Sequence, residues 1–214
     1  MPRPHRIQTA GYIHHVVTRG NDKQILFRRN KDFHVFLKYF KKAQSIYPVK
    51  IYNFVLMSNH LHFVVEPEQD GNLSALMKII LKQYATYFNS HYKHTGHVFQ
   101  GRFKSFLIQT ELYFFRCLRY IDFNPMKSGI SAHPKQYKWC GHNALAYGAK
   151  TPLPVALHSL YLGLGRTSQE RQDAYRLLIK TLPDENLDLL KKRSCILGDR
   201  AFKQKIKMQK VSGT

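Results

Sequence analysis

Two histidines that flank a single leucine, His60 and His62 in MSNHLHFVVEP, are the first residues of this 214-residue chain that could do chemistry. The β-branched and aromatic run after them predicts a strand, in which residues two apart share a face with Cα atoms roughly 6.5–7 Å apart. Two such imidazoles can converge on one divalent cation. Mg²⁺ and Mn²⁺ also require oxygen ligands, so the pair needs an oxygen-bearing partner. Without one, a strand that carries two imidazoles by chance is an adequate explanation.

A candidate partner lies in RYIDFNPMKSG, residues 119–129, where Tyr120 and Asn124 are four residues apart. On a helix such residues share a face, so Asn124 would offer its amide oxygen to a cation beside Tyr120. Pro125 predicts that the helix ends there and that Asn124 is a terminal residue. A phenol with a pKa near 10 attacks a phosphodiester only when the phosphorus is made electrophilic or the phenol proton is removed. A cation on the phosphate oxygens would do the first, and the product would be a phosphotyrosine ester.

The elements that must position these residues follow from hydrophobic periodicity. Short β-branched or aromatic runs predict strands, and apolar residues spaced by three and four predict helices. The predicted strands are 12–18, 50–57, 60–67 and 102–109, and the predicted helices are 33–43, 73–88 and 111–123. The first six elements have the βαββαβ order of a ferredoxin-like antiparallel sheet. We therefore expect an α+β fold with the candidate nucleophile on the helix that follows this sheet.

After about Trp139 the pattern of the sequence changes to turn-rich and helical segments. GAKTPLP is a turn-rich linker, and TSQE, residues 167–170, predicts a capping box for a helix through Leu182. Residues 187–210 also have a helical pattern and end in the basic KQKIKMQK, which indicates either a phosphate contact or a solvated end. The sequence thus predicts a catalytic domain over residues 1–147 and an α-helical C-terminal lobe over residues 148–214.

Charge indicates the class of partner. The chain has 34 lysines and arginines against 13 aspartates and glutamates, which gives a net charge of +21. Nucleic acid is the usual partner of such an excess, because each neutralised phosphate releases counterions. No apolar run approaches the roughly 18 residues of a membrane span, and no secretory signal is evident. Three cysteines stand far apart without a CxxC pair, which favours a cytoplasmic protein over a disulfide-linked one: Cys117, Cys140 and Cys195.

Five basic residues are candidates for DNA contact. Arg102 and Lys104 are predicted to share one face of a strand beside an aromatic residue, a combination that suits the accessible phosphates and bases of a single strand. The alternative is a solvated basic edge that protects the sheet from aggregation. The prediction extends to Arg3, Arg19 and Lys127.

Other tyrosines and histidines have plainer explanations. Tyr84 and Tyr87 fall in or beside the apolar stripe of the second helix, which favours a core role over that of a nucleophile. His14 and His15 are adjacent on a strand and must face opposite sides, so they cannot act as a pair. We assign His15 a core or edge role near the candidate site.

Four stretches together resemble the REP-associated tyrosine transposases, which belong to the single-tyrosine HUH group: YIHHVVTRGN, YNFVLMSNHLHFVVEP, GHVFQGRFKS and CLRYIDFNPMKSG. The resemblance covers roughly residues 1–147. It implies that His60, His62 and Asn124 hold Mg²⁺ or Mn²⁺ and that Tyr120 is the nucleophile. It also implies cleavage of single-stranded DNA beside hairpins, which leaves a 5′-phosphotyrosine and a free 3′-hydroxyl for strand transfer.

Two other functions remain open from the sequence. A non-catalytic protein could bind hairpin nucleic acid through its sheet, with the histidines in structural roles. A rolling-circle replication initiator would share the chemistry but act at a plasmid or phage origin. The resemblance is compatible with either a monomer or a homodimer.

Overall fold

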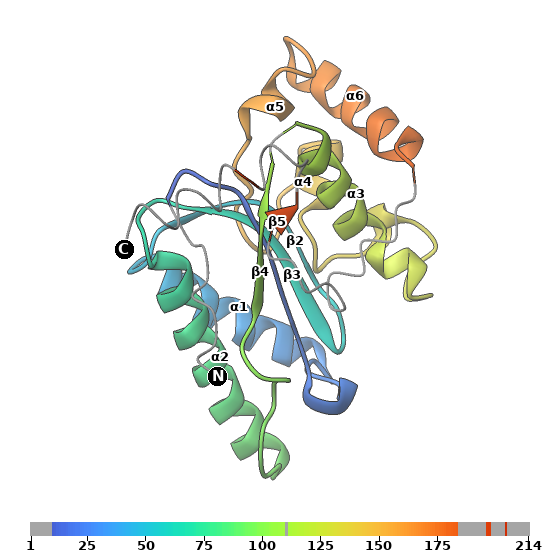
Figure 1. The fold of residues 1–214 in the computed structure, drawn as a ribbon. Coiled ribbons are helices and arrows are strands. Elements are labelled where there is room, and N and C mark those ends of the chain that lie inside the picture. The colour runs from blue at the N-terminus through green and yellow to red at the C-terminus, as the bar shows by residue number, and fades with distance from the viewer. Residues whose placement is uncertain (1–9, 110, 184–195, 198–203, 205–214) are drawn as a thin grey trace.

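The computed structural model describes residues 10–109, 111–183, 196–197 and 204 as an antiparallel sheet with helices on both faces (Figure 1). The strands are β1 (His14–Arg19), β2 (Val49–Leu56), β3 (His60–Pro67), β4 (Lys104–Ile108) and β5 (Ile196–Leu197). The helices are η1 (Asn21–Lys23), α1 (Asn30–Gln44), α2 (Asn72–Tyr92), α3 (Glu111–Lys127), η2 (Pro134–Gln136), α4 (His142–Tyr147), α5 (Ser159–Leu162) and α6 (Ser168–Thr181). None of the helices in these described ranges is long and apolar enough to cross a membrane.

The sheet has the strand order β2-β3-β1-β4-β5, and its first four strands are antiparallel. This order is that of the ferredoxin-like βαββαβ unit, so the predicted fold is confirmed. The two-residue strand β5 pairs in parallel with β4. The helix expected over residues 187–210 is therefore wrong at residues 196–197, and nearly all of its remainder lies outside the described residues.

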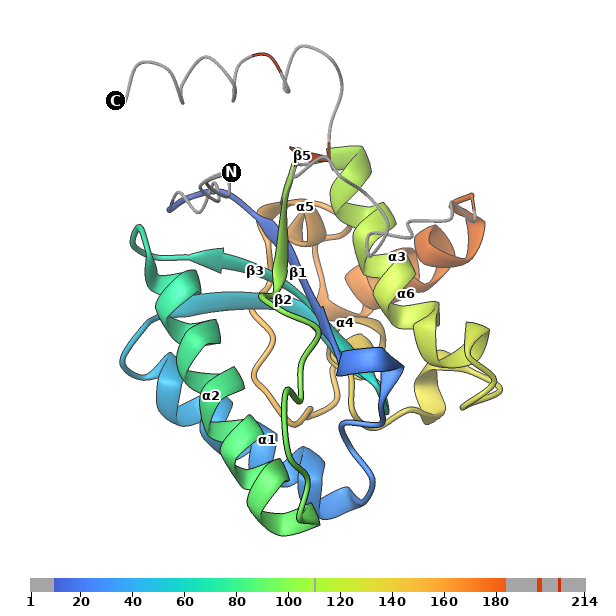
Figure 2. The ribbon, with the colours of Figure 1, turned by 60° about the horizontal axis from the view of Figure 1, so that its bottom comes forward.

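One face of the sheet forms the larger part of the core. Leu61, Phe63 and Val65 point to this face from β3 and are almost completely buried. The helices α1 and α2 lie side by side over this face of the sheet (Figure 2). The ring of Phe40 on α1 stacks on that of Phe63 at 4.8 Å. Burial of each such side chain stabilises the fold by about 1.5–3 kcal/mol. Tyr84 also belongs to this core, where its hydroxyl donates to the carbonyl of Leu26 at 2.7 Å, so its assignment as a core residue is confirmed.

The opposite face of the sheet carries α3. The helix runs through Pro125 to Lys127, so the prediction that it ends at Pro125 is wrong. Proline removes one helical donor, but the next turn still closes, because the amide of Ser128 donates to the carbonyl of Asn124 at 3.0 Å. Tyr120 and Asn124 consequently lie on one face of a continuous helix, and this arrangement does not depend on a helix terminus.

A buried carboxylate on α3 joins that helix to the sheet and to the C-terminal part of the chain. Asp122 accepts hydrogen bonds from Asn53 on β2 at 2.8 Å, from His142 on α4 at 2.8 Å and from Tyr175 on α6 at 2.7 Å. The contact with α6 crosses the domain boundary predicted after residue 147. The boundary itself stays a prediction. The capping box predicted at residues 167–170 is confirmed, with Thr167 accepting from the amide of Glu170 at 3.1 Å.

We expect Asp122→Ala to lower the free energy of unfolding by about 3–5 kcal/mol, because three buried donors then lose the carboxylate that pairs with them. Tyr175→Phe is the matched control. It removes only one donor and should cost about 1.5–3 kcal/mol, as expected for one hydrogen bond to a charged group. Urea unfolding followed by circular dichroism measures both. Equal decreases in the free energy of unfolding for the two variants would contradict the prediction that Asp122 stabilises all three donors.

Candidate active site

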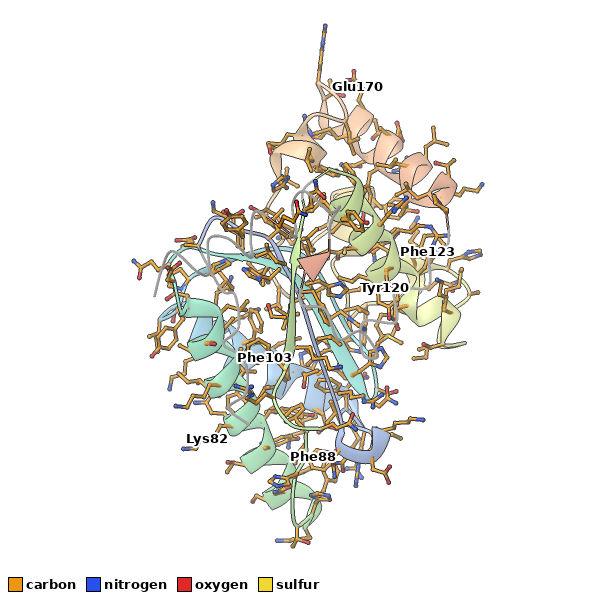
Figure 3. The ribbon with its side chains drawn as sticks, in the orientation of Figure 1. Lys82, Phe88, Phe103, Tyr120, Phe123 and Glu170 are labelled. Carbon is orange, nitrogen blue, oxygen red and sulfur yellow. The ribbon has the colours of Figure 1, made fainter. Side chains whose placement is uncertain are left out.

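His60 and His62 project from β3 toward α3, on the face of the sheet opposite Leu61. Their ring centroids lie 5.1 Å apart, and the ring of His62 lies 5.3 Å from that of Tyr120. Figure 3 shows Tyr120 where α3 passes the sheet. The strand alternation and the helical spacing predicted from sequence thus bring both histidines and the tyrosine together within one chain.

Asn124 faces His60 across this site. The Nε2 atom of His60 is 3.2 Å from Oδ1 of Asn124, and its Nδ1 is 2.7 Å from Oδ1 of Asn59. Burial is the main cause that lowers the pKa of His60. The contact with Asn124 raises this pKa, and the nearby Arg19 guanidinium lowers it. Because the net shift is downward, the ring is neutral at pH 7 and has one N–H. If Nδ1–H donates to Asn59, the lone pair of Nε2 meets an oxygen lone pair. Two acceptors in this position fit a cation between them.

His62 is paired with a histidine from β1. Its Nδ1 lies 3.0 Å from Nε2 of His15, and its own Nε2 is buried without a hydrogen-bond partner among the described residues. When His62 donates from Nδ1 to His15, its Nε2 keeps a lone pair, which is the state a metal ligand requires. Burial lowers the pKa of His15 to about 3, and burial together with the two neighbouring histidines holds the pKa of His62 well below its ordinary value.

The donor set of this site suits a divalent cation. Two neutral imidazoles and one amide oxygen are ligands that Mn²⁺ accepts, and Mg²⁺ would complete its shell with water and phosphate oxygens. The 3.2 Å between His60 and Asn124 is close to the roughly 3 Å that separates neighbouring ligands of a six-coordinate ion. Among the described residues, no three His, Cys, Asp or Glu side chains form a metal-holding group. A cation at this site would therefore need a ligand of another type, such as the amide oxygen of Asn124.

His15 contributes more to this site than the sequence indicated. It is buried as predicted, but it also contacts His62, and its ring lies 6.0 Å from that of Tyr120. The register explains this: Val17, two residues further on β1, lies opposite His62 on β3. Residues two apart share a face, so His15 joins the same side of the sheet. The register of β1 against β3 is set by long-range contacts, which the order of the elements along a single sequence does not specify.

Acid should destabilise the metal-free protein through these histidines. In the folded state their pKa values lie below the ordinary 6.5, and that of His15 is about 3, so the unfolded chain binds protons that the folded protein does not. The free energy of unfolding is retained above pH 6.5 and falls as the pH drops from about 6.5 toward 3. Urea unfolding from pH 7.5 to 4.5 measures the slope. Below about pH 5.5, where the unfolded histidine is almost fully protonated, we expect His15→Gln to reduce this slope by about 1.4 kcal/mol per pH unit. An unchanged slope would contradict the burial of His15 in its neutral form.

Two of the predicted DNA-contact residues lie beside the histidines. Lys104 is exposed at the start of β4 and lies opposite Val17, so Lys104 and His62 belong to one row across the same face of the sheet. Arg19 is half-buried at the end of β1 opposite His60, and its Nε donates to the side chain of Gln100. Both cations therefore lie on the same side of the sheet as His60 and His62.

The other three basic residues are placed differently. Arg102 lies in the bend before β4 rather than on the strand with Lys104, so the prediction of a shared strand face is wrong. Sequence periodicity did not locate the start of the strand, which Gly101 with its positive φ of 71° delays. Lys127 is exposed in the last turn of α3. Arg3 lies outside the described residues.

Comparisons with known proteins agree with this fold. The family model described as "Transposase IS200 like" matches residues 8–124, more than half of the chain. Among solved structures, a REP-associated tyrosine transposase bound to a REP hairpin has 19% sequence identity and a TM-score of 0.56, over 74% of this chain and 96% of that one. Among curated proteins no significant match was found.

The fold is that of an α+β protein, and the family model that matches it describes transposases. The chain belongs to the family of IS200-like transposases. The fold expected from the resemblance to REP-associated tyrosine transposases is confirmed.

Proposed function

We propose that this chain is a metal-dependent endonuclease and strand transferase that acts on single-stranded DNA beside hairpin-forming repeats. The observation that supports it most directly is the convergence of Tyr120, His62, His60 and Asn124 at one site within one chain. Family membership supports DNA transposition as the biological process. It also favours a transposase over a rolling-circle replication initiator with the same chemistry.

Tyr120 would attack the scissile phosphodiester. A bond forms between the phenolic oxygen and phosphorus while the bond from phosphorus to the 3′ oxygen breaks. The phenol loses its proton, and the departing 3′ oxygen gains one and leaves as a hydroxyl. The 5′ phosphate then remains on Tyr120 as a phosphotyrosine, which keeps the free energy of the phosphodiester. Attack by the 3′-hydroxyl of another strand reverses these bond changes, transfers the strand and releases the tyrosine.

The surrounding residues would prepare the phosphate and the cation. His60, His62 and Asn124 would hold Mg²⁺ or Mn²⁺, with His15 fixing the tautomer of His62. The bound cation would withdraw charge from the non-bridging phosphate oxygens and make phosphorus more electrophilic. Lys104 would add positive charge for the DNA backbone on the same face.

Hairpin DNA is the proposed partner, because a protein of similar fold is described as bound to a REP hairpin. The net charge of +21 supports a polyanionic partner. The described cysteines Cys117 and Cys140 are buried thiols, which suits a reducing cytoplasm. The tyrosine and histidines meet within one chain, so a homodimer is not required to complete the site.

The test uses the full-length protein and a hairpin oligonucleotide with single-stranded flanks, labelled at its 3′ end. With Mn²⁺ or Mg²⁺, we expect a protein-linked labelled strand on a denaturing gel. With EDTA, the adduct should disappear while binding to the hairpin persists. A fully paired duplex of the same composition is the matched control and should give no adduct. Binding without any adduct in either metal would instead indicate a non-catalytic hairpin-binding protein.

A further inference from the structure

A pocket separate from the candidate metal site lies beside α3, the helix that carries Tyr120. It has a volume of about 530 Å³, within the range of small-molecule sites. It is lined by residues of α3, η2, α4 and α6, and Figure 3 shows Phe123, one of these residues, on α3 next to Tyr120. Its lining includes Phe123, Met126, Lys135, His142, Tyr147 and Ile179.

The walls of this pocket suit a flat aromatic ring. Phe123 and Met126 line it from α3, and Ile179 lines it from α6. Tyr147, on α4, is exposed by 37%, which is a large exposure for an aromatic side chain. Aromatic and thioether side chains pack well against a nucleobase, and base stacking is tolerant of base identity.

Three cations line the pocket, and we call them its rim: Lys135, Arg176 and Lys180. The Nζ atom of Lys135 lies 4.6 Å from the ring centre of Tyr147, and the guanidinium of Arg176 lies 5.0 Å from the same ring. Arg176 is held in place by Asp173 and by the carbonyl of Ala146. Lys180 adds a further exposed cation at the lining. A phosphate is the group that such a rim would attract.

One polar side chain is fixed in the lining. His142 is 3% exposed, and its Nδ1 donates to the buried carboxylate of Asp122 at 2.8 Å. This hydrogen bond leaves Nε2 as the ring atom available to an occupant. A small number of fixed polar groups in a largely apolar pocket is typical of sites that orient a ligand.

The pocket is also coupled to the tyrosine. Phe123 follows Tyr120 by three residues, about 4.5 Å along the helix axis. Asp122, which holds His142, lies between them and ties α3 to β2 and α6. An occupant would therefore touch the helix that positions Tyr120 and Asn124.

We propose that this pocket binds one unpaired nucleotide of the DNA, with its base between Phe123, Met126 and Ile179, its polar edge at His142 and its phosphate at the rim of Lys135, Arg176 and Lys180. This inference rests on the proposed function, because it assumes that the flanks of the hairpin pass along α3. Binding of this nucleotide would determine which phosphodiester of the strand lies at Tyr120. The pocket itself would take no part in the cleavage chemistry.

The test is a double-mutant cycle that combines a change in the DNA with a change in the pocket. Each flanking nucleotide of the hairpin oligonucleotide is replaced in turn by an abasic residue, and binding to the full-length protein is measured by fluorescence anisotropy in EDTA. We expect one flanking position at which loss of the base weakens binding on the order of tenfold. In Met126→Trp, which fills the pocket, the intact oligonucleotide should bind as weakly as the abasic one, and that position should no longer matter.

Two further variants make the result specific. Lys180→Glu reverses one exposed charge at the rim and should weaken binding of the flanked hairpin more than that of a hairpin without flanks. Lys38→Glu, an exposed residue on α1 across the sheet, makes the same charge change and should affect both hairpins equally. The proposal is overturned if Met126→Trp leaves the effect of every abasic position unchanged and Lys180→Glu affects the two hairpins equally, as Lys38→Glu does. The same result would be expected if a segment of the chain itself filled the pocket. Adduct formation by the unaltered protein, measured alongside, shows independently whether the proposed function holds.

Discussion

Tyr120→Phe is expected to abolish the covalent protein-DNA adduct, with a decrease of at least about 10⁴-fold in its rate of formation. The substitution removes the only atom of this side chain that can bond to phosphorus. The ring, which lies 5.3 Å from that of His62, stays in place. The hairpin oligonucleotide with a 3′ label measures the effect, because the labelled fragment is the one that would remain on the protein.

The control for this variant is Tyr113→Phe. Tyr113 is half-buried on the same helix, two turns before Tyr120, and its ring lies 5.7 Å from the guanidinium of Arg116. The control should form adduct at the rate of the unaltered protein, and both variants should bind the hairpin equally well in EDTA. An adduct with Tyr120→Phe would show that another residue is the nucleophile.

Asn124→Ala is expected to weaken Mn²⁺ binding by at least about 100-fold, which exceeds the usual effect of losing a residue that only orients a ligand. The change removes the oxygen that lies 3.2 Å from Nε2 of His60 and leaves two imidazoles to hold the ion. Hairpin binding in EDTA should remain. The concentration of free Mn²⁺, followed by electron paramagnetic resonance, gives the affinity without reference to cleavage.

Two comparisons sharpen this prediction. Asn124→Asp keeps an oxygen in the same position and adds a negative charge, so it should restore Mn²⁺ binding. Asn89→Ala removes an amide from α2, across the sheet from the site, and should leave the affinity unchanged. Equal affinities for the unaltered protein and Asn124→Ala would exclude Asn124 as a ligand.

The sequence by itself determined the relations that are local along the chain. Alternation on one strand put His60 and His62 on the same face, and the helical period did the same for Tyr120 and Asn124. These relations depend only on backbone geometry, so they could be predicted without knowing what each element packs against. The order of strands and helices added the sheet topology, because few arrangements accommodate it.

Tertiary structure decided which of these local faces meet. The register of β1 against β3 brought His15 to His62, and the packing of α3 across the sheet brought Tyr120 to both. The continuation of α3 through Pro125 was also not given by the local pattern, and the buried Asp122 ties this helix to β2, α4 and α6. Such contacts join residues distant in the chain, and their free energy depends on burial and on partners that a local pattern does not contain.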